Sequence, residues 1–242
     1  MIDGILPFVI GHRGASGSAP ENTLAAACRA HDLGARWIEI DVQLAKDGVP
    51  VVFHDHTLER TTNGEGAVAA QTADQLARLD AGAWFSPDFA GERVPTLEEM
   101  LSVCREIGLG LNVELKPAVG TDLATARAVA DVLRGADQPL LISSFSILAL
   151  AAFHDAAPHL SLGALFKRPP QTRAPLSGLP FYSVHVAANA TEKADVTRLT
   201  LGGYRVLVYT VNDVALGSRL RDWGVTAIFT DHPNRFTAQN SA

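Results

Sequence analysis

The stretch "WIEIDVQLAKDGVPVVFHD", residues 37–55, decides the fold of this chain. In its first half, Glu39, Asp41 and Gln43 alternate with apolar residues. A β-strand points successive side chains to opposite faces, so these polar side chains share one face and the apolar ones share the other. The pattern therefore predicts a strand that brings two carboxylates together.

The second half of this stretch predicts a hairpin. The short turn at 46–48 separates the first strand from another apolar run, Val49–His54. A parallel crossover needs a dozen or more residues, so a gap this short permits only an antiparallel pair. The hairpin should place His54 near Ile40 or Asp41.

Outside this stretch, short apolar runs alternate with helical patterns. With the strand Arg36–Gln43 of that stretch included, the predicted barrel strands are Phe8–Gly11, Arg36–Gln43, Gly110–Leu115, Leu140–Ser143, Ser161–Phe166, Phe181–Val186, Arg205–Tyr209 and Ala227–Phe229. The predicted helices are residues 22–34, with Asn22 as N-cap, and Thr96–Ile107, Asp122–Leu133, Ile147–Ala156, Glu192–Leu201 and Val214–Trp223. Without the hairpin strand, eight strands alternate with helices, which predicts a TIM (β/α)8 barrel.

A doubly wound open sheet is the alternative fold, and the lack of a G-x-G-x-x-G turn after the first strand weakens it. We expect one catalytic domain over residues 1–242, with an extra β-hairpin strand. A small segment at 55–95, rich in turn residues, should be inserted after the second barrel strand.

The composition narrows the classes of partner. The chain has 242 residues, of which 47% are hydrophobic, and a net charge of −6. The negative charge argues against nucleic acid as a partner. The start of the chain lacks a positive leader, and no apolar run reaches the roughly 18 residues that a membrane span needs. We therefore expect a cytoplasmic protein without stable membrane insertion, and the sequence leaves the oligomeric state open.

Residues that can do chemistry cluster at the predicted strand ends, where the active sites of TIM barrels lie. Four segments bring them to one rim: His12 and Arg13, Glu39 and Asp41, His54, and Glu114 and Lys116.

Three of these residues, Glu39, Asp41 and Glu114, carry carboxylates that would repel one another. One divalent cation would relieve the repulsion, and an all-oxygen ligand set favours Mg²⁺ or Ca²⁺ over zinc. Arg13 and Lys116 are donors suited to a phosphate. The alternative is an ion pair between the carboxylates and these two cations inside the barrel.

His12 and His54 can form a proton-transfer pair near neutral pH. Metal, cations and histidines together fit the cleavage of a phosphodiester. The sequence leaves other residues open: His185 lines the pocket or is structural, and Tyr209 lines the pocket or packs in the barrel. Asp231 could cap the segment that follows it.

The insertion contains Trp84 and Phe85, which could cover the substrate or hold the insertion in place.

The sequence resembles the glycerophosphodiester phosphodiesterase family nearly from end to end. The matching motifs, in the family's order, are "HRGASGSAPENTLAA", "WIEIDVQLAKDGVPVVFHDHTLERTTNGEG", "VPTLEEML", "LNVELK", "VYTVND" and "IFTDHP". The resemblance implies a TIM barrel that hydrolyses glycerophosphodiesters to sn-glycerol 3-phosphate and an alcohol.

By position, the resemblance implies metal ligands at Glu39, Asp41 and Glu114, acid–base catalysis by His12 and His54, and phosphate contacts from Arg13 and Lys116. Two residues depart from the family pattern. Ala45 replaces a common Thr, and Tyr209 replaces a common Trp, which could change the head group accepted.

The leading hypothesis is metal-dependent hydrolysis of small glycerophosphodiesters such as glycerophosphocholine and glycerophosphoethanolamine, with His54 as base and His12 as acid. One alternative is a lysophospholipase D or phospholipase C-like enzyme acting on a lipid. The other is a non-catalytic barrel that binds a polyol phosphate.

Overall fold

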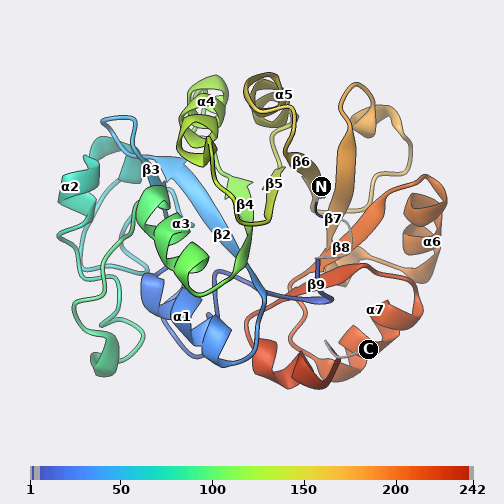
Figure 1. Cartoon of the computed structure of the whole chain (residues 1–242), viewed down its shortest axis with the longest axis horizontal. Helices are drawn as coiled ribbons and strands as arrows, with labels where there is room; N and C mark the ends of the chain where they lie inside the picture. The colour runs from blue at the N-terminus through green and yellow to red at the C-terminus, as the bar shows by residue number, and fades with distance from the viewer. Residues whose placement is uncertain (1, 3–5, 240–242) are drawn as a thin grey trace.

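The computed structural model describes residue 2 and residues 6–239, and this part of the chain forms a closed parallel barrel (Figure 1). The barrel strands are β1 (Val9–Gly11), β2 (Trp37–Leu44), β4 (Gly110–Leu115), β5 (Leu140–Ser144), β6 (Ser161–Phe166), β7 (Phe181–Ala187), β8 (Arg205–Tyr209) and β9 (Ala227–Thr230). Strand β1 pairs in parallel with both β9 and β2, which closes the ring. The predicted TIM barrel is confirmed, and the open-sheet alternative is wrong.

Helices cover the outside of the ring (Figure 1). They are α1 (Leu24–Asp32), α3 (Leu97–Glu106), α4 (Asp122–Leu133), α5 (Ile147–Ala156), α6 (Lys193–Leu201) and α7 (Val214–Asp222). Short 3-10 turns at Ala174–Leu176, Ala188–Ala190 and Pro233–Gln239 complete the connections. In α3 the buried residues are Leu97, Met100, Leu101 and Cys104, the spacing that turns one helical face to the barrel.

The start of helix α1 differs from the prediction. The N-cap is Thr23, whose hydroxyl accepts a hydrogen bond from the Ala26 amide at 3.1 Å. Asn22 instead has a positive φ of 59° and turns its side chain toward Asp41. Asn22 and Thr23 are both residue types that cap helices. Because the Asn22 side chain forms hydrogen bonds with the buried Asp41, Thr23 is left as the N-cap.

Strand β3 (Pro50–Val52) runs antiparallel to β2 outside the ring, as the hairpin prediction requires. Val42 lies opposite Val52, and the amide of Phe53 donates to the carbonyl of Asp41 at 2.9 Å. Continuing this register places His54 beside Ile40, so the predicted return of the histidine is confirmed.

The base of the barrel lumen is apolar. Trp37, Leu141, Leu207 and Phe229 belong to one buried cluster there. Trp37 fits because its register partner on β4, Gly110, has no side chain: a Cβ on Gly110 would lie 2.4 Å from Cε2 of the indole. The charged residues of β2 and β4 therefore stand above a packed hydrophobic base.

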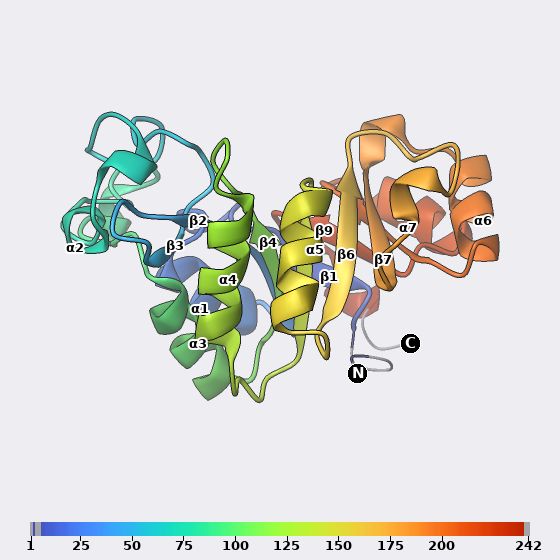
Figure 2. The same ribbon diagram turned by 90° about the horizontal axis from the view of Figure 1, so that it is seen from above.

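Residues 55–95, the expected insertion, lie between β3 and α3 and share a hydrophobic cluster with the β2–β3 hairpin. The insertion contains the 3-10 turns Val68–Ala70 and Pro87–Phe89 and helix α2 (Ala73–Leu76). The buried members of the cluster are Ala45, Val51, Phe53, Leu58, Val68, Leu76, Ala81 and Val94. In Figure 2 the insertion lies on the same side of the barrel as the long connection after β6.

The two aromatic residues of the insertion hold it together. Phe85 makes edge-to-face contacts with both Trp84 and Phe89, each at 5.7 Å between ring centroids. The indole of Trp84 donates to the carbonyl of Ala81 at 2.9 Å. Of the two roles left open for Trp84 and Phe85, these contacts favour the structural one.

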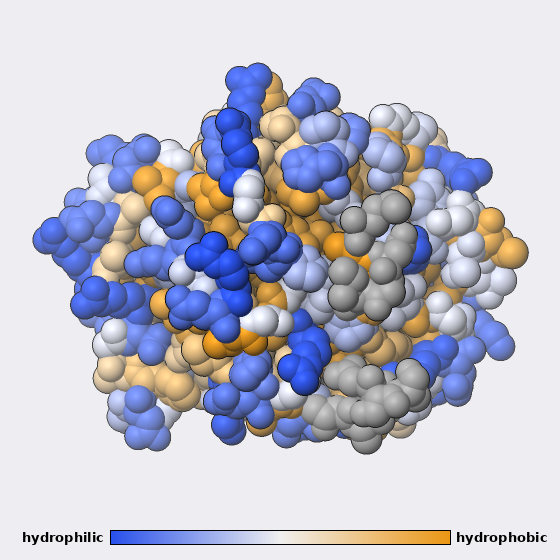
Figure 3. All heavy atoms as spheres, viewed as in Figure 1, coloured by the Kyte–Doolittle hydropathy of each residue, from blue (hydrophilic) through white to orange (hydrophobic). Residues whose placement is uncertain are grey.

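The surface on the face shown in Figure 3 carries hydrophilic side chains around its periphery, with hydrophobic ones in patches between them. Within residue 2 and residues 6–239, no helix has the length and apolar composition that a bilayer crossing requires.

Candidate active site

The predicted site residues meet in one cavity of about 310 Å³ at the carboxyl ends of the strands. Its lining includes the full predicted set: His12, Arg13, Glu39, Asp41, His54, Glu114, Lys116 and Tyr209. Segments up to about 200 residues apart in sequence reach one place because the barrel closes, as its architecture dictates.

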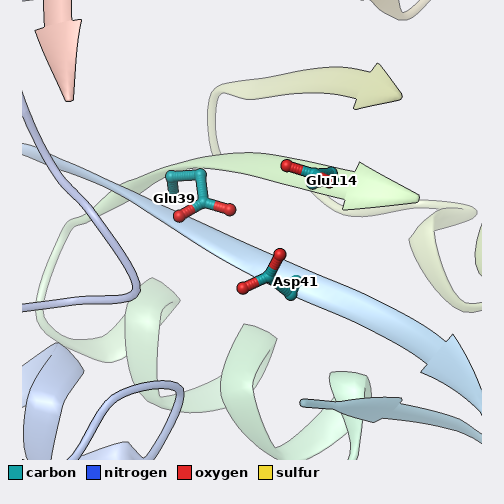
Figure 4. A group of neighbouring side chains, drawn as sticks. All are labelled: Glu39, Asp41 and Glu114. Carbon is teal, nitrogen blue, oxygen red and sulfur yellow. The ribbon is translucent and has the colours of Figure 1, made fainter. Parts of the chain in front are cut away.

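Three carboxylates form the centre of the cavity. Glu39 and Asp41 project from β2 and Glu114 projects from β4, and Figure 4 shows them turned toward a common space. Each offers an oxygen within 4.8 Å of the others, and all three residues are buried. The parallel register sets Asp41 directly beside Glu114, which explains the close approach.

Two cations flank the carboxylates. The Nε of Arg13 lies 3.3 Å from Asp41 Oδ2, and the Nζ of Lys116 lies 3.4 Å from Asp41 Oδ1 and 3.7 Å from Glu114 Oε1. The backbone amide of Arg13 also donates to Glu39 at 2.9 Å. Two positive charges against three carboxylates leave the cluster one positive charge short of balance.

The deficit of positive charge is reflected in the pKa values of the carboxylates. Burial raises the pKa of Glu114 to about 8, and the neighbouring Asp41 charge adds to the effect. Burial, together with the charges of Asp41 and Glu114, also raises the pKa of Glu39 well above its ordinary value. For Asp41, burial opposes ionisation, but the charges of Arg13 and Lys116 outweigh it and lower the pKa.

This donor set fits a divalent cation. Three buried carboxylates converge on one space, and burial raises the pKa of two of them, Glu39 and Glu114, above their ordinary values. Oxygen-only ligation is typical of Mg²⁺ and Ca²⁺ sites. The residues that could hold the ion are therefore Glu39, Asp41 and Glu114, as the sequence predicts.

The barrel itself supports His12. The Nδ1 of its ring lies 2.7 Å from Oδ1 of Asp231, at the end of β9, and its Nε2 lies 4.0 Å from Glu39. Asp231 also accepts from Ser16 at 2.9 Å and from the Asn212 amide at 2.6 Å. Although burial opposes it, these hydrogen bonds and the His12 interaction lower the pKa of Asp231. An ionised Asp231 keeps the proton on Nδ1 and leaves Nε2 to face the cavity.

The insertion supports His54. Its Nδ1 lies 2.5 Å from Oδ1 of Asp55, and Asp55 in turn accepts two hydrogen bonds from Arg60, at 2.5 and 3.1 Å. Arg60 reaches further and donates to Glu21 at 2.7 and 2.8 Å, while Glu21 accepts from Arg13 at 2.8 Å. A chain of ion pairs thus joins one histidine to the arginine of the opposite loop.

A protein-family model matches most of the chain. The model of the glycerophosphoryl diester phosphodiesterase family matches residues 12–235. The chain belongs to this family.

Curated relatives and solved structures carry the same family name. A glycerophosphodiester phosphodiesterase of Caldanaerobacter subterraneus subsp. tengcongensis is 43% identical over 164 residues, which cover 66% of this chain and 67% of that protein. A glycerophosphodiester phosphodiesterase of Bacillus subtilis is 34% identical and covers 95% of this chain and 85% of that protein.

A solved phosphodiesterase of Oleispira antarctica, in complex with the product sn-glycerol-3-phosphate, is 38% identical with a TM-score of 0.95. The alignment covers 98% of each chain.

In this glycerophosphoryl diester phosphodiesterase family member, the "PENT" segment supports the site. The side-chain amide of Asn22 donates to Asp41 Oδ2 at 2.9 Å, and its oxygen accepts from the Asp41 amide at 3.2 Å. Asn22 therefore fixes a carboxylate of the cluster rather than a helix end.

Two residues left open by the sequence line the cavity wall. The hydroxyl of Tyr209 donates to the carbonyl of Phe166 at 3.0 Å, and its ring packs edge-to-face against Phe145. Burial, and after it the charge of Glu114, raises the pKa of Tyr209 to about 12, so the phenol stays neutral. His185 is fully buried and lines the cavity between Leu165 and Phe229.

Sequence reasoning missed two supporting residues. Asp231 holds His12, and Arg60 joins the supports of His54 and Arg13. The signal for Asp231 was its place at the end of the last strand, which a closed barrel brings beside the first. Arg60 stands in an irregular segment, where no periodicity indicates what its side chain reaches.

Proposed function

We propose that this chain hydrolyses small glycerophosphodiesters to sn-glycerol 3-phosphate and an alcohol, with help from a divalent cation. One observation carries the proposal: a single cavity holds three clustered carboxylates, two cations and two histidines that each have a carboxylate partner. The activity named for the relatives, and the product bound to the Oleispira antarctica enzyme, support this choice of reaction.

The cation would be held by Glu39, Asp41 and Glu114. When bound, Mg²⁺ or Ca²⁺ supplies positive charge that polarises a phosphoryl oxygen. Arg13 and Lys116 stand beside these carboxylates and would bind the phosphate oxygens by charge-assisted hydrogen bonds. Together they would orient the phosphodiester between the two histidines.

Proton transfer falls to the histidines in this proposal. His54 takes the proton of the substrate's glycerol 2-hydroxyl, whose oxygen attacks phosphorus, and His12 protonates the alcohol that leaves. Water then opens the resulting cyclic phosphate. In that step His12 takes a proton from the water and His54 returns its proton to the 2-oxygen, so both residues regain their starting states.

The electrostatics of His54 support its assignment as base. Burial, and beyond it the charges of Arg13 and Lys116, lower the pKa of His54 despite the opposing charge of Asp41. An imidazole with a lowered pKa is unprotonated near neutral pH, which is the form that a base needs.

The size of the cavity favours a small substrate over a lipid. A volume of about 310 Å³ lies at the lower end of the range for small-molecule sites, roughly 300–1,000 Å³. A glycerophosphodiester with a short head group suits such a cavity better than one with an acyl chain.

The test is release of glycerol 3-phosphate from glycerophosphocholine, with Mg²⁺, with Ca²⁺ and with EDTA. We expect product with metal and none with EDTA. A parallel arm uses lysophosphatidylcholine, and faster turnover of that lipid would replace the proposed substrate class. Thermal stabilisation by glycerol 3-phosphate without turnover of any diester would favour a binding barrel.

A further inference from the structure

Exposed apolar side chains gather at the end of the barrel that carries the cavity. They stand at the starts of two neighbouring helices, Val119 and Leu123 at α4 and Phe145 and Leu148 at α5. Among the described residues, these four make up more than half of the large hydrophobic side chains that are exposed. Val119 is fully exposed and Leu148 is 58% exposed. We call these four residues the apolar patch, because apolar groups that gather in this way mark a contact surface.

The apolar patch is one surface rather than two separate loops. Helices α4 and α5 pack side by side (Figure 1), and the hydroxyl of Ser146 donates to the carboxylate of Asp122, which joins the starts of the two helices. Figure 2 shows the loop before α4 on the same side of the barrel as the insertion and the connection after β6. The patch therefore faces outward beside the cavity.

Two unpaired cations border the apolar patch. Lys167 and Arg168 directly follow β6 and are exposed, and among the described residues neither takes part in an ion pair. They lie near the patch because the hydroxyl of Tyr209 donates to the carbonyl of Phe166, while the ring of Tyr209 packs against Phe145. The contact surface thus combines apolar side chains with positive charge.

The segment that carries these cations offers no carboxylate to offset them. Residues 156–191 contain no Asp or Glu, although the chain has 26 acidic residues and a net charge of −6. The third cation of this segment, Arg173, is used within the fold, since it donates to the carbonyl of Gly202 at 2.6 Å and lies over the ring of Tyr204. A partner that is apolar in part and negatively charged would complement the surface.

We propose that the apolar patch, with Lys167 and Arg168, docks this protein reversibly onto an anionic lipid surface. The apolar side chains would enter the headgroup layer, and the two cations would pair with lipid phosphates. The lipid is a surface for docking and not the substrate, so this proposal goes beyond the proposed function and does not depend on turnover. The fold assembles the surface from three separate connections, which is why no continuous stretch of sequence indicates it.

A second copy of the chain suits this surface less well. A two-fold contact brings the same patch of both copies together. Lys167 and Arg168 of one copy would then approach those of the other, and residues 156–191 hold no carboxylate that could separate them. Lipid phosphates supply the negative charge that a second copy lacks at this place.

The test is co-sedimentation with phosphatidylglycerol vesicles, with phosphatidylcholine vesicles as the uncharged reference. EDTA is present throughout, so that no metal ion bridges protein and lipid. We expect the wild type to bind phosphatidylglycerol vesicles, and Val119→Ser combined with Leu148→Ser to weaken binding roughly ten-fold, because less apolar surface enters the lipid. Lys167→Gln combined with Arg168→Gln should weaken it roughly thirty-fold and remove the preference over phosphatidylcholine.

Leu201→Ser and Arg219→Gln are the matched controls. Both residues are exposed in the last turns of α6 and α7, at the opposite end of the barrel, so vesicle binding should stay at the wild-type level. Because every substituted side chain is exposed, thermal melts of all variants should match the wild type, which separates weakened docking from loss of the fold.

Three results would overturn the proposal. The first is a wild type that binds neither kind of vesicle, and the second is patch and cation variants that bind as tightly as the controls. The third comes from sedimentation velocity without lipid: a wild-type dimer that the Val119 and Leu148 changes convert to monomer, with no vesicle binding, would assign the surface to a contact between copies. Turnover of glycerophosphocholine without vesicles tests the proposed function independently of all three.

Discussion

The two histidines of the cavity are held by different regions of the molecule. His12 is held by Asp231, which is itself fixed by Ser16 and Asn212, so its support comes entirely from loops at the ends of barrel strands. His54 is held by Asp55, whose other partner, Arg60, belongs to the insertion and is 44% exposed. The comparison teaches that similar geometry at two ring nitrogens can rest on supports that differ in exposure and in their place in the fold.

Removing either ring tests whether the two histidines are equal in chemistry despite their unequal supports. We expect His12→Ala and His54→Ala each to lower kcat by roughly 10²–10⁴-fold, because each would remove one proton transfer. Turnover of glycerophosphocholine under saturating Mg²⁺ measures this. A variant that keeps wild-type kcat would take that histidine out of the mechanism.

Neutralising the two supporting carboxylates sharpens the contrast. Asp231→Asn and Asp55→Asn should each lower kcat by roughly 10–100-fold, by analogy with the loss of a carboxylate that orients a metal-binding histidine. Asp55→Asn should also raise KM, because freeing Arg60 loosens Glu21 and through it Arg13. Steady-state kinetics separate the two effects, and equal changes in KM for both variants would contradict the difference.

The carboxylate cluster lies in the same cavity as the two histidines, and its affinity for a cation should depend on pH. Burial raises the pKa of Glu114 to about 8, so a cation that binds there would have to displace a proton at neutral pH. Apparent Ca²⁺ affinity should therefore rise between pH 6 and pH 8, by up to about ten-fold per unit.

Glu114 also determines the direction in which the folding stability of the metal-free protein changes with pH. Its pKa is higher folded than unfolded, so the native state binds the extra proton, and stability falls as the pH rises from the unfolded value toward 8. Thermal melts with and without Ca²⁺ at pH 6, 7 and 8 measure both trends. Glu114→Gln should make them shallower, and unchanged slopes in that variant would assign the titration elsewhere.

Replacing Arg60 should have the smallest effect on kcat of these substitutions, and it tests most directly whether the two histidines have different supports. Arg60→Ala should lower kcat roughly five-fold, since exposed ion pairs contribute up to about 1 kcal/mol each. Arg78→Ala is the matched control, because Arg78 lies in the same insertion and pairs only at the surface, with Asp74 at 2.6 Å. Combined with His54→Ala, the Arg60 change should have little further effect on kcat, whereas with His12→Ala it should keep its full effect. The opposite pattern would show that Arg60 does not act through His54.

The sequence was sufficient where a local rule decided the outcome. Alternation along residues 37–44 predicts that Glu39 and Asp41 share a face, and the short turn predicts the return of His54. The barrel follows from eight strands that alternate with helices, and its closure brings Glu114 and His12 to the same rim.

Sequence reasoning was insufficient where closure or a long side chain decided the outcome. Asp231 meets His12 only because β9 pairs with β1, more than two hundred residues earlier. Arg60 meets Asp55 and Glu21 through a flexible side chain in irregular structure. Asn22 looked like a helix cap because its alternative partner, Asp41, is a tertiary contact.

The hydrophobic cluster that the insertion shares with the hairpin is separate from the main core of the barrel, and this has a consequence for how the enzyme would fail on heating. Local unfolding follows cooperative units, and a small cluster opens more readily than a closed barrel. Local unfolding of the insertion would separate Arg60 from Asp55 and so weaken the support of His54 while the barrel remained folded. Thermal inactivation would then precede unfolding of the barrel, and different tryptophan residues report the two events. Trp84 in the insertion is 41% exposed, whereas Trp37 is sealed in the lumen and Trp223 lies at the end of α7, so in a Trp223→Phe variant the fluorescence of Trp84 and Trp37 would report inactivation and melting separately.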